Sequence, residues 1–415
     1  MTTQRPATVL VGTGGYGLRH LRSLLELHRH RAVELVGLVD IAVNDTAKQL
    51  VSSYVCSPTW HSHLGDALSA APVDSVVIAT PPHEHFDLAS RAILAGAAVY
   101  LEKPPVTLLQ DLDALADLPA RRRVEVGFQE SRATVEALER AWVATGREEI
   151  KRIVAHGALS RPDAYYRRGR WAGEWFLDGR AVLDGPLFNP LAHVVQAALL
   201  FAGRSERNWF PVMVEAECFR ARRLRGDDTS AIRITARRGP QVLAVGTTAT
   251  DVVVPPGVTV HTGSGAIHVA NGGRRTVAFR HGIRVPVTPV ASTPGALDAT
   301  VTDPDGEADP MLSLESTRHF VLTTNAAVQA AGTPVEAPVA ARFSTRNGQP
   351  VTEVAGLGRL VAACVRRGTL LSEADPAWGG ATRRVGTTGY RGLAHPELAT
   401  APSALSARTG HGGVS

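Results

Sequence analysis

The stretch Thr8–Leu21, TVLVGTGGYGLRHL, is the part of this 415-residue chain that decides its N-terminal fold. An apolar run stops at Gly12, and three further glycines, Gly14, Gly15 and Gly17, follow within six positions. Glycine costs conformational entropy, so four in a short turn indicate a backbone that takes unusual angles or lets another group come close. The residues that follow place leucines at helical spacing. The stretch therefore predicts a buried strand, a tight turn and a helix.

A glycine turn between a strand and a helix is the context that the dinucleotide-binding pattern GxGxxG requires. We expect Gly12 to permit the turn, Gly14 to let a pyrophosphate approach the backbone, and Gly17 to let the helix pack against the strand. The free N–H groups and partial positive charge of the helix N-terminus favour the phosphates. The residues predicted to contact the cofactor in this loop are Gly12, Thr13, Gly14, Gly15, Tyr16 and Gly17.

The second predicted strand, VELVGLVD, ends in Asp40. An acidic residue about 20 positions after the glycine turn binds the adenosine ribose hydroxyls in such domains, and its charge repels a 2′-phosphate. Ile41 offers no guanidinium for that phosphate, so the sequence favours NAD over NADP. The alternative is that Asp40 only caps the next loop.

Strand-like and helix-like segments alternate through the first third of the chain, which predicts right-handed βαβ units and a parallel sheet. After about Gly146, strand-like runs with turn signals between them predict a mostly antiparallel, open-faced sheet. We therefore expect an α/β Rossmann domain over residues 1–128 and an α+β substrate-binding and oligomerisation domain over 129–372. The last stretch, 373–415, is rich in Gly, Thr, Ser, Ala and Pro, and is expected to be a flexible tail.

The composition is that of an ordinary globular protein, with 44% hydrophobic and 20% charged residues. The formal net charge is +5, but the basic residues are scattered without interleaved aromatic residues, which disfavours nucleic acid as a partner. The three cysteines lie far apart and fit neither a zinc site nor a disulfide framework, which favours a cytoplasmic location. No apolar run is long enough to span a membrane, and no metal site is expected.

Two further motifs give the sequence a family resemblance. The segment VVIATPPHEHFDLASRAILAGAAVYLEKPP, at 76–105, contains Thr80-Pro81-Pro82, then His85, then Glu102-Lys103-Pro104 after a predicted strand. The segment VLDGPLFNPLAHVV, at 182–195, is similar to a second signature written GGxxxDxxxH. Together with the glycine turn, these pieces resemble the Gfo/Idh/MocA family of NAD(P)-dependent oxidoreductases, over most of the chain.

The resemblance implies that Lys103 reaches the reacting hydroxyl or carbonyl of the substrate and that Glu102 orients it. A partly desolvated ammonium has a lowered pKa and can act as a base, and when charged it stabilises a developing alkoxide. The resemblance also implies that five residues of these motifs contact the cofactor: Thr80, Pro81, His85, Glu102 and Lys103. The alternative for Lys103 is an exposed lysine at a strand end.

Asn189 and His193 are four residues apart on a predicted helical segment, so they are expected to face the same way. In the family these positions carry an aspartate and a histidine that face the substrate carbon beside the nicotinamide. Asparagine cannot take up a proton, so Asn189 is expected to orient the substrate or His193, while Lys103 and His193 exchange protons. Asp184 stands where the signature has its first glycine, a second departure. The alternative for His193 is a histidine packed within a helix.

The stretch before Asn189 combines aromatic residues with arginines. We expect Tyr165, Arg168 and Trp171 to contact a sugar or an anionic polyol, together with Asn189 and His193. The alternative is that these aromatic residues pack a subunit interface.

The function implied by the resemblance is an NAD-dependent dehydrogenase or reductase acting on a secondary alcohol of a sugar, cyclitol or related polyol. One alternative is a glycosidase-like enzyme that oxidises its substrate transiently. Another is a non-catalytic NAD- and sugar-binding regulatory module, which the asparagine at position 189 would permit. A homodimer or homotetramer is expected from the resemblance. The sequence determines neither the substrate nor the direction of the reaction.

Overall fold

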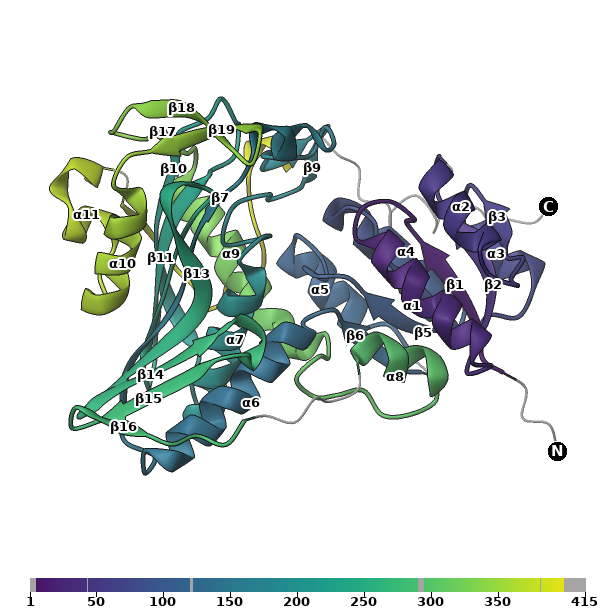
Figure 1. Cartoon of the computed structure of the whole chain (residues 1–415), viewed down its shortest axis with the longest axis horizontal. Coiled ribbons are helices and arrows are strands. Elements are labelled where there is room, and N and C mark those ends of the chain that lie inside the picture. Colours follow the sequence, from purple (N-terminus) through teal and green to yellow (C-terminus); the bar gives the residue numbers. More distant parts are fainter. Residues whose placement is uncertain (1–4, 43, 120–121, 290–294, 381, 399–415) are drawn as a thin grey trace, which may run out of the picture.

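The N-terminal domain is built on a six-stranded parallel sheet (Figure 1). The computed structural model describes residues 5–42, 44–119, 122–289, 295–380 and 382–398. The strand order is β3-β2-β1-β4-β5-β6. The strands β2 and β3 therefore lie on one side of β1, and β4, β5 and β6 lie on its other side. The strands are β1 (Ala7–Val11), β2 (Glu34–Val39), β3 (Thr59–His61), β4 (Ser75–Ile78), β5 (Ala98–Leu101) and β6 (Val124–Val126). The intervening helices are α1 (Gly17–Arg29), α2 (Asp45–Ser52), α3 (Leu64–Ala70), α4 (His85–Leu94) and α5 (Leu109–Ala116).

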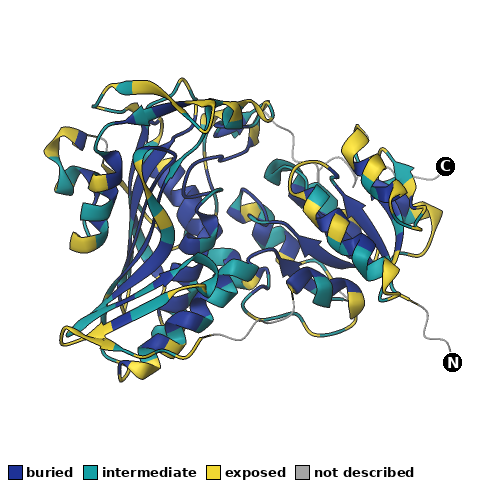
Figure 2. Cartoon of the chain, viewed as in Figure 1, coloured by how far each residue is buried: buried dark blue, intermediate teal, exposed yellow. Residues whose placement is uncertain are grey.

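The central strands of this sheet are mostly apolar because both faces are covered. β4 and β5 are buried at every position. Figure 2 shows the middle of the sheet mainly in the colour of buried residues. In α1, Leu21, Leu24 and Leu25 form the buried stripe that packs on the sheet. The predicted Rossmann fold is confirmed. Its carboxyl edge between β1 and β4 is where ligands bind in such sheets.

The second domain contains a twelve-stranded mixed sheet whose central path runs β16-β15-β14-β13-β7-β12-β11-β10-β17. Most neighbours are antiparallel, as predicted, but β7 and β12 run parallel. The strands on the path are β7 (Ile150–Ser160), β10 (Pro211–Arg220), β11 (Thr229–Ala236), β12 (Gln241–Thr247), β13 (Ala249–Thr262), β14 (Gly265–Ala270), β15 (Thr276–Arg280), β16 (Ile283–Val285) and β17 (Val335–Glu336). A small separate sheet pairs β8 (Phe176–Leu177) with β9 (Arg180–Ala181).

Helices cover one face of the large sheet, and the other face is covered only in part. On one face lie α6 (Gln129–Ala144), α7 (Ala192–Ser205) and α9 (Arg318–Ala331), on the side toward the Rossmann domain (Figure 1). On the other face, α10 (Leu357–Arg367) and α11 (Leu371–Ala374) cover part of the sheet. A second apolar core lies between them, because this face of the strands carries residues such as Val154, Leu243 and Val245.

The segment expected to be a flexible tail is ordered over much of its length. Within it, β20 (Arg383–Gly386) pairs with β10. Before this segment, in the part predicted as the second domain, a hairpin of β18 (Ala341–Arg346) and β19 (Gln349–Val354) joins the sheet through β13. Trp378 is buried against Phe219, with ring centroids 4.9 Å apart. The expectation was therefore wrong for 373–398, where composition concealed buried aromatic contacts. Residues 399–415 lie outside the described part of the chain.

The chain returns to the Rossmann domain after the large sheet has formed. α8 (Ala296–Thr302) packs against β4, β5 and β6. Beyond it, the N–H of Val126 donates to the carbonyl oxygen of Leu312 at 2.7 Å. On α9, the buried Asn325 bonds both the N–H of Leu109 and the carbonyl oxygen of Thr107. The two domains are therefore joined by several segments.

Within the residues that the structure describes, no helix is both long and apolar enough to cross a bilayer. The same residues contain no group of three or more His, Cys, Asp or Glu side chains arranged to hold a metal ion.

Candidate active site

The glycine turn between β1 and α1 lies beside the end of β4, at the carboxyl edge of the parallel sheet. Gly12 has a φ of +86°, and a Cβ there would lie 2.7 Å from the carbonyl oxygen of Ala79. A Cβ on Gly17 would lie 2.0 Å from the carbonyl oxygen of Gly12. Beside Gly14 and Gly15, in contrast, a Cβ would meet no described atom within 4 Å. The turn is closed on its inner side and open on the side where a ligand would lie.

The open side of the turn fits the pyrophosphate of a dinucleotide. α1 begins at Gly17 with no side-chain cap and no acidic residue in its first turn, so its N-terminal N–H groups have no side-chain acceptor there. Thr80 Oγ1 is buried beside the turn without a hydrogen-bond partner among the described residues. Tyr16, which precedes the helix, is 47% exposed. These are the features that a bound phosphate group would satisfy.

Asp40 is attached to the glycine turn through Thr13. The N–H and Oγ1 of Thr13 both donate to Asp40 Oδ2, at 2.8 and 2.7 Å. The other carboxylate oxygen, Oδ1, accepts from the N–H of Ala42 at 3.3 Å, in the loop that follows β2. Asn44 accepts from the N–H of Ala47 at 2.6 Å and caps α2. The Thr13 side chain is fully buried and holds Asp40, which leaves its backbone as the part able to contact a cofactor.

His85 is fully buried and holds two loops together. Its Nδ1 lies 2.9 Å from the carbonyl oxygen of Pro104, and its Nε2 lies 2.9 Å from that of Thr80. Burial lowers the pKa of His85 below its ordinary value. The side chain thus fixes the loop of Thr80 and Pro81 against the turn after β5, and it does not reach the space beside the glycine turn.

Glu102 is also an interior residue. Its Oε1 pairs with Nε2 of His20 at 2.7 Å, and its Oε2 accepts from the N–H of Lys103 at 3.1 Å. Burial favours its neutral form, but the His20 hydrogen bond and the Lys103 charge hold the pKa of Glu102 below its ordinary value. Glu102 is therefore ionised, and it fixes the backbone from which the Lys103 side chain extends.

The amine of Lys103 extends from the Rossmann domain to the second domain. Its Nζ donates to Asn189 Oδ1 at 2.8 Å and to the carbonyl oxygen of Asn189 at 3.1 Å. Burial lowers the pKa of Lys103, while the negative charges of Glu102 and Asp184 oppose that shift. A lysine held in this way can exchange its proton closer to neutral pH than a lysine in water can.

Asn189 is held in turn by a carboxylate. Its Nδ2 donates to Asp184 Oδ1 at 2.7 Å. The other oxygen, Oδ2, accepts from Arg168 Nη2 and from the N–H of Gly173, both at 2.8 Å. Asn189 lies in the turn before α7, which begins at Ala192, so the expected helix starts three residues later than Asn189. Asp184 is almost fully buried, at 5% exposure.

His193 lies in the first turn of α7. Ser131 donates its hydroxyl proton to the carbonyl oxygen of His193 at 2.8 Å, and the same Oγ lies 3.5 Å from Nδ1. A hydroxyl that has already donated can only accept, which favours the tautomer with the proton on Nδ1 and leaves Nε2 as a proton acceptor. Burial, together with the charge of Lys103, lowers the pKa of His193 to about 4. The imidazole is therefore neutral at neutral pH.

Tyr165, Arg168 and Trp171 gather in one cluster, as their spacing predicted. The Arg168 Cζ lies 3.7 Å from the Tyr165 ring centroid and 4.2 Å from that of Trp171. The two aromatic faces therefore contact the guanidinium that binds Asp184. The cluster borders the site and supports Asp184, and no described observation assigns it to a substrate.

Sequence reasoning missed the roles of His20, Ser131 and Asp184. His20 is four residues past Tyr16 on the helical face that carries Leu21 and Leu24, so a burial pattern alone presents it as core. Ser131 comes from α6, distant in sequence from everything it contacts. The sequence did carry a signal for Asp184. This carboxylate stands at the first glycine position of the second signature, five positions before Asn189, which stands where the signature has an aspartate.

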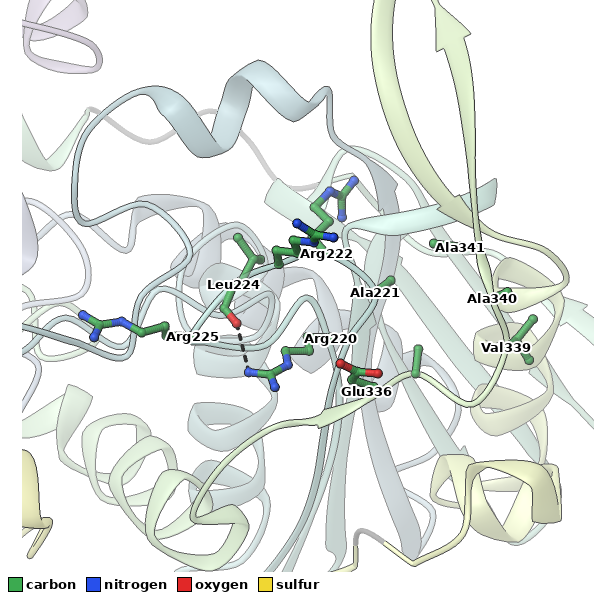
Figure 3. A pocket seen from close by; sticks show the side chains of 11 residues that line it. Arg220, Ala221, Arg222, Leu224, Arg225, Glu336, Val339, Ala340 and Ala341 are labelled. Atoms are coloured by element: carbon green, nitrogen blue, oxygen red, sulfur yellow. Dashed lines mark hydrogen bonds between the residues drawn. The ribbon is translucent and has the colours of Figure 1, made fainter.

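A separate cavity of about 470 Å³ lies between the loop that follows β10 and the segment 336–341 (Figure 3). It is lined by four arginines, Arg220, Arg222, Arg223 and Arg225, and three of these have acceptors of their own among the described residues. Arg220 donates to the carbonyl oxygen of Leu224, Arg222 pairs with Asp228, and Arg225 pairs with Glu174. Lys103, Asn189 and His193 are not among its lining residues, so the cavity is distinct from the candidate active site.

The fold and the site define a dinucleotide-binding Rossmann domain joined to an α/β domain that covers its carboxyl edge. Residues 7–129 match the Gfo/Idh/MocA model, described as an oxidoreductase family with an NAD-binding Rossmann fold. The resemblance seen in the sequence motifs is confirmed over these residues, as is the NAD-binding class of the domain.

Among curated proteins, an inositol 2-dehydrogenase from Azotobacter vinelandii is 26% identical over 216 residues, which cover 48% of this chain and 58% of that protein. Inositol 2-dehydrogenase 3 from Saccharopolyspora erythraea is 30% identical over 37% of this chain and 41% of that protein. The matches thus span about half of these relatives. Among solved structures, the WlbA dehydrogenase of Bordetella pertussis, in complex with NADH and UDP-GlcNAcA, superposes with a TM-score of 0.63. The two sequences are 22% identical, and the superposition covers 84% of this chain and 99% of that chain. This similarity is one of fold.

Proposed function

We propose that this protein is an NAD-dependent oxidoreductase acting on a secondary alcohol of a cyclitol, sugar or related polyol. The observation that carries the proposal is the position of Lys103. Its amine has a lowered pKa, is hydrogen-bonded from across the domain boundary, and follows the strand next to β4 at the carboxyl edge of the sheet. The names of the curated relatives, inositol 2-dehydrogenases, support the substrate class.

The glycine turn and Asp40 would hold the cofactor, with the pyrophosphate beside Gly14 and the ribose hydroxyls beside the carboxylate. A bound NAD would supply the acceptor for the hydride of the carbinol carbon. Lys103, as the neutral amine, takes the proton from the substrate hydroxyl while the C–H bond breaks. In the reverse direction it returns that proton to the carbonyl oxygen. The neutral His193 accepts a hydrogen bond at Nε2 from a neighbouring hydroxyl of the substrate and so orients the substrate.

The direct test is turnover of purified protein with NAD and a panel of inositols and sugars, followed by the absorbance of reduced nicotinamide. Turnover that depends on Lys103 supports the proposal. Turnover that survives Lys103→Met unchanged overturns the assigned chemistry. Nucleotide and sugar binding without turnover across the panel would favour the regulatory module, because Asn189 cannot take up a proton. Net cleavage of a glycoside with NAD unchanged would favour the glycosidase-like reaction.

A further inference from the structure

The amide of Asn189 has its two ends bound by different groups. Its oxygen accepts from Lys103, and its nitrogen donates to Asp184. A carboxylate only accepts hydrogen bonds, so the NH2 end of the amide must face Asp184. The oxygen end must then face Lys103.

Asp184 is itself held rigidly. Arg168 and the N–H of Gly173 bind its Oδ2, and the Arg168 side chain lies between two aromatic rings with only 24% of its surface exposed. Its other oxygen is left to Asn189. On the side facing Lys103, Asp184 therefore has one hydrogen-bond partner, the amide of Asn189.

We propose that Asp184 is the positioning residue of this site, supplying through Asn189 the negative charge that the aspartate of the second signature would supply directly. The inference rests on the proposed function. It assigns to Asp184 the role of orienting Lys103 in a site that has an asparagine, and no carboxylate, at position 189. The hydrogen-bonded chain runs from Arg168 through Asp184 and Asn189 to Lys103.

The arrangement suits a lysine that changes protonation state. A protonated amine has three N–H donors, and a neutral amine has two donors and one lone pair. Asn189 offers two acceptors to Nζ, its side-chain and main-chain oxygens. Both hydrogen bonds therefore persist in both states, and the remaining position presents either a proton or a lone pair. If the amide were turned, its NH2 would face Lys103 and that orientation would be lost.

Lys103 can be observed by itself, because the chain has only three lysines, Lys48, Lys103 and Lys151. The other two are exposed. Carbon-13 labelling of lysine in the full-length protein, without added nucleotide, therefore gives one buried signal to titrate and two internal references. For Asp184→Asn we expect the Lys103 signal to titrate at lower pH than in the wild type, because an opposing negative charge has been removed.

In turnover, Asp184→Asn should lower kcat about 10- to 100-fold, the size of effect seen when a group that orients a functional side chain is removed, with KM for NAD little changed. The double variant Asp184→Asn with Asn189→Asp moves the carboxylate next to Lys103. It should restore the Lys103 titration and part of the lost kcat. Asp178→Asn is the matched control, since this carboxylate also pairs with an arginine of the same stretch but at the surface.

Arg168→Gln gives a second variant should Asp184→Asn unfold. We expect its kcat to fall as well, but its Lys103 signal to titrate at higher pH than in the wild type, because a positive charge has been removed. An unchanged Lys103 titration together with unchanged kcat in Asp184→Asn overturns the inference. So does a double variant that is worse than either single change. If the wild type turns over no sugar or cyclitol, the proposed function fails, while the lysine titration still decides whether Asp184 acts on Lys103.

Discussion

The side-chain oxygen of Asn189 lies 2.8 Å from the amine of Lys103, and this hydrogen bond joins a residue of the Rossmann domain to one of the second domain. It replaces the ion pair that an aspartate would make. The result is a lysine that is oriented by a neutral group and influenced at longer range by Asp184 and Glu102. The chemistry of the site therefore depends on which state Lys103 occupies at the working pH.

Replacing Lys103 by arginine should abolish proton exchange while retaining a positive charge. Arginine does not lose its proton in proteins, and its planar group cannot repeat the two hydrogen bonds to Asn189. We expect kcat to fall about 10²- to 10⁴-fold, the usual contribution of a positioned acid or base. Nucleotide binding, followed by fluorescence, should be retained. Lys151→Arg at the surface is the control, and a Lys103→Arg variant with normal kcat would contradict the assigned role.

The pH profile should show no separate inflection near 6.5. His193, with its pKa lowered to about 4 by burial and the Lys103 charge, stays neutral well below the ordinary value for histidine. For alcohol oxidation, kcat/KM should rise as the pH increases through the pKa of Lys103, because the neutral amine is the base, and that pKa lies below the ordinary 10.5. Measuring kcat/KM from mildly acid to alkaline pH tests this. A midpoint near 6.5 that disappears in His193→Gln would show that the imidazole is solvated instead.

The same histidine contributes to stability with a definite sign. Unfolded, it binds a proton near 6.5, whereas folded it does so only near 4. The contribution is fully present above 6.5 and is lost as the pH falls toward 4. His193→Gln should therefore flatten that part of the curve of unfolding free energy against pH, measured by urea titration.

Two glycines of the same turn should respond differently to alanine. A Cβ on Gly14 meets open space, so Gly14→Ala should fold with normal Tm but bind NAD about 10-fold more weakly or worse, because the methyl group lies where the pyrophosphate would approach. A Cβ on Gly17 would lie 2.0 Å from a carbonyl oxygen, so Gly17→Ala should lower Tm. Gly65→Ala, also facing open space but far from the turn, is the control. Equal behaviour of the first two variants would contradict the geometry.

Asp40→Ser should shift cofactor preference toward NADP. The carboxylate that would bind the ribose hydroxyls also repels a 2′-phosphate, so its removal weakens NAD binding and relieves that repulsion. We expect the ratio of Kd for NADP to Kd for NAD to fall at least about 10-fold, measured by calorimetry. Asp45→Ser, at the exposed start of α2, should leave the ratio unchanged. A ratio unaffected by Asp40→Ser would separate this residue from cofactor choice.

Trp378→Ala should destabilise the second domain by about 3–5 kcal/mol, the usual cost of removing a buried aromatic side chain. Trp378 is buried against Phe219, in the core between the large sheet and α10 and α11. Chemical denaturation measures the loss. A change below 1 kcal/mol, as at an exposed position, would mean that the segment after 373 does not pack on the sheet.

The parts of this protein that depend on local pattern could be predicted from the sequence. The glycine turn, the βαβ alternation and the turn after β5 each depend on residues close together in the chain, and each lies where expected. The parts that depend on long-range packing could not be predicted. Trp378, in a stretch of small polar residues, gave no sign of its partner Phe219, more than a hundred positions earlier.

The same limit applied to the candidate site. Lys103, Asn189 and His193 were singled out from motifs, but only the folded chain brings Asp184 against Asn189 and Ser131 against His193. His85 and Glu102 illustrate the reverse case. Their motifs suggested contact with a ligand, whereas the fold uses them inside the protein to brace the loops that carry Thr80 and Lys103.

The return of the chain through α8 to the edge of β6 has a mechanical consequence. The N–H of Val126 donates a hydrogen bond to the carbonyl oxygen of Leu312. Glu125 accepts hydrogen bonds from Thr300 Oγ1 and from the N–H of Asp309, so the returning segment is fixed to the Rossmann domain at several points. If the chain crossed between the two domains once, that crossing could act as a hinge. Several crossings make a hinge motion of the two domains more difficult. We therefore expect the two domains to swing apart less widely than a pair joined by one crossing of the chain.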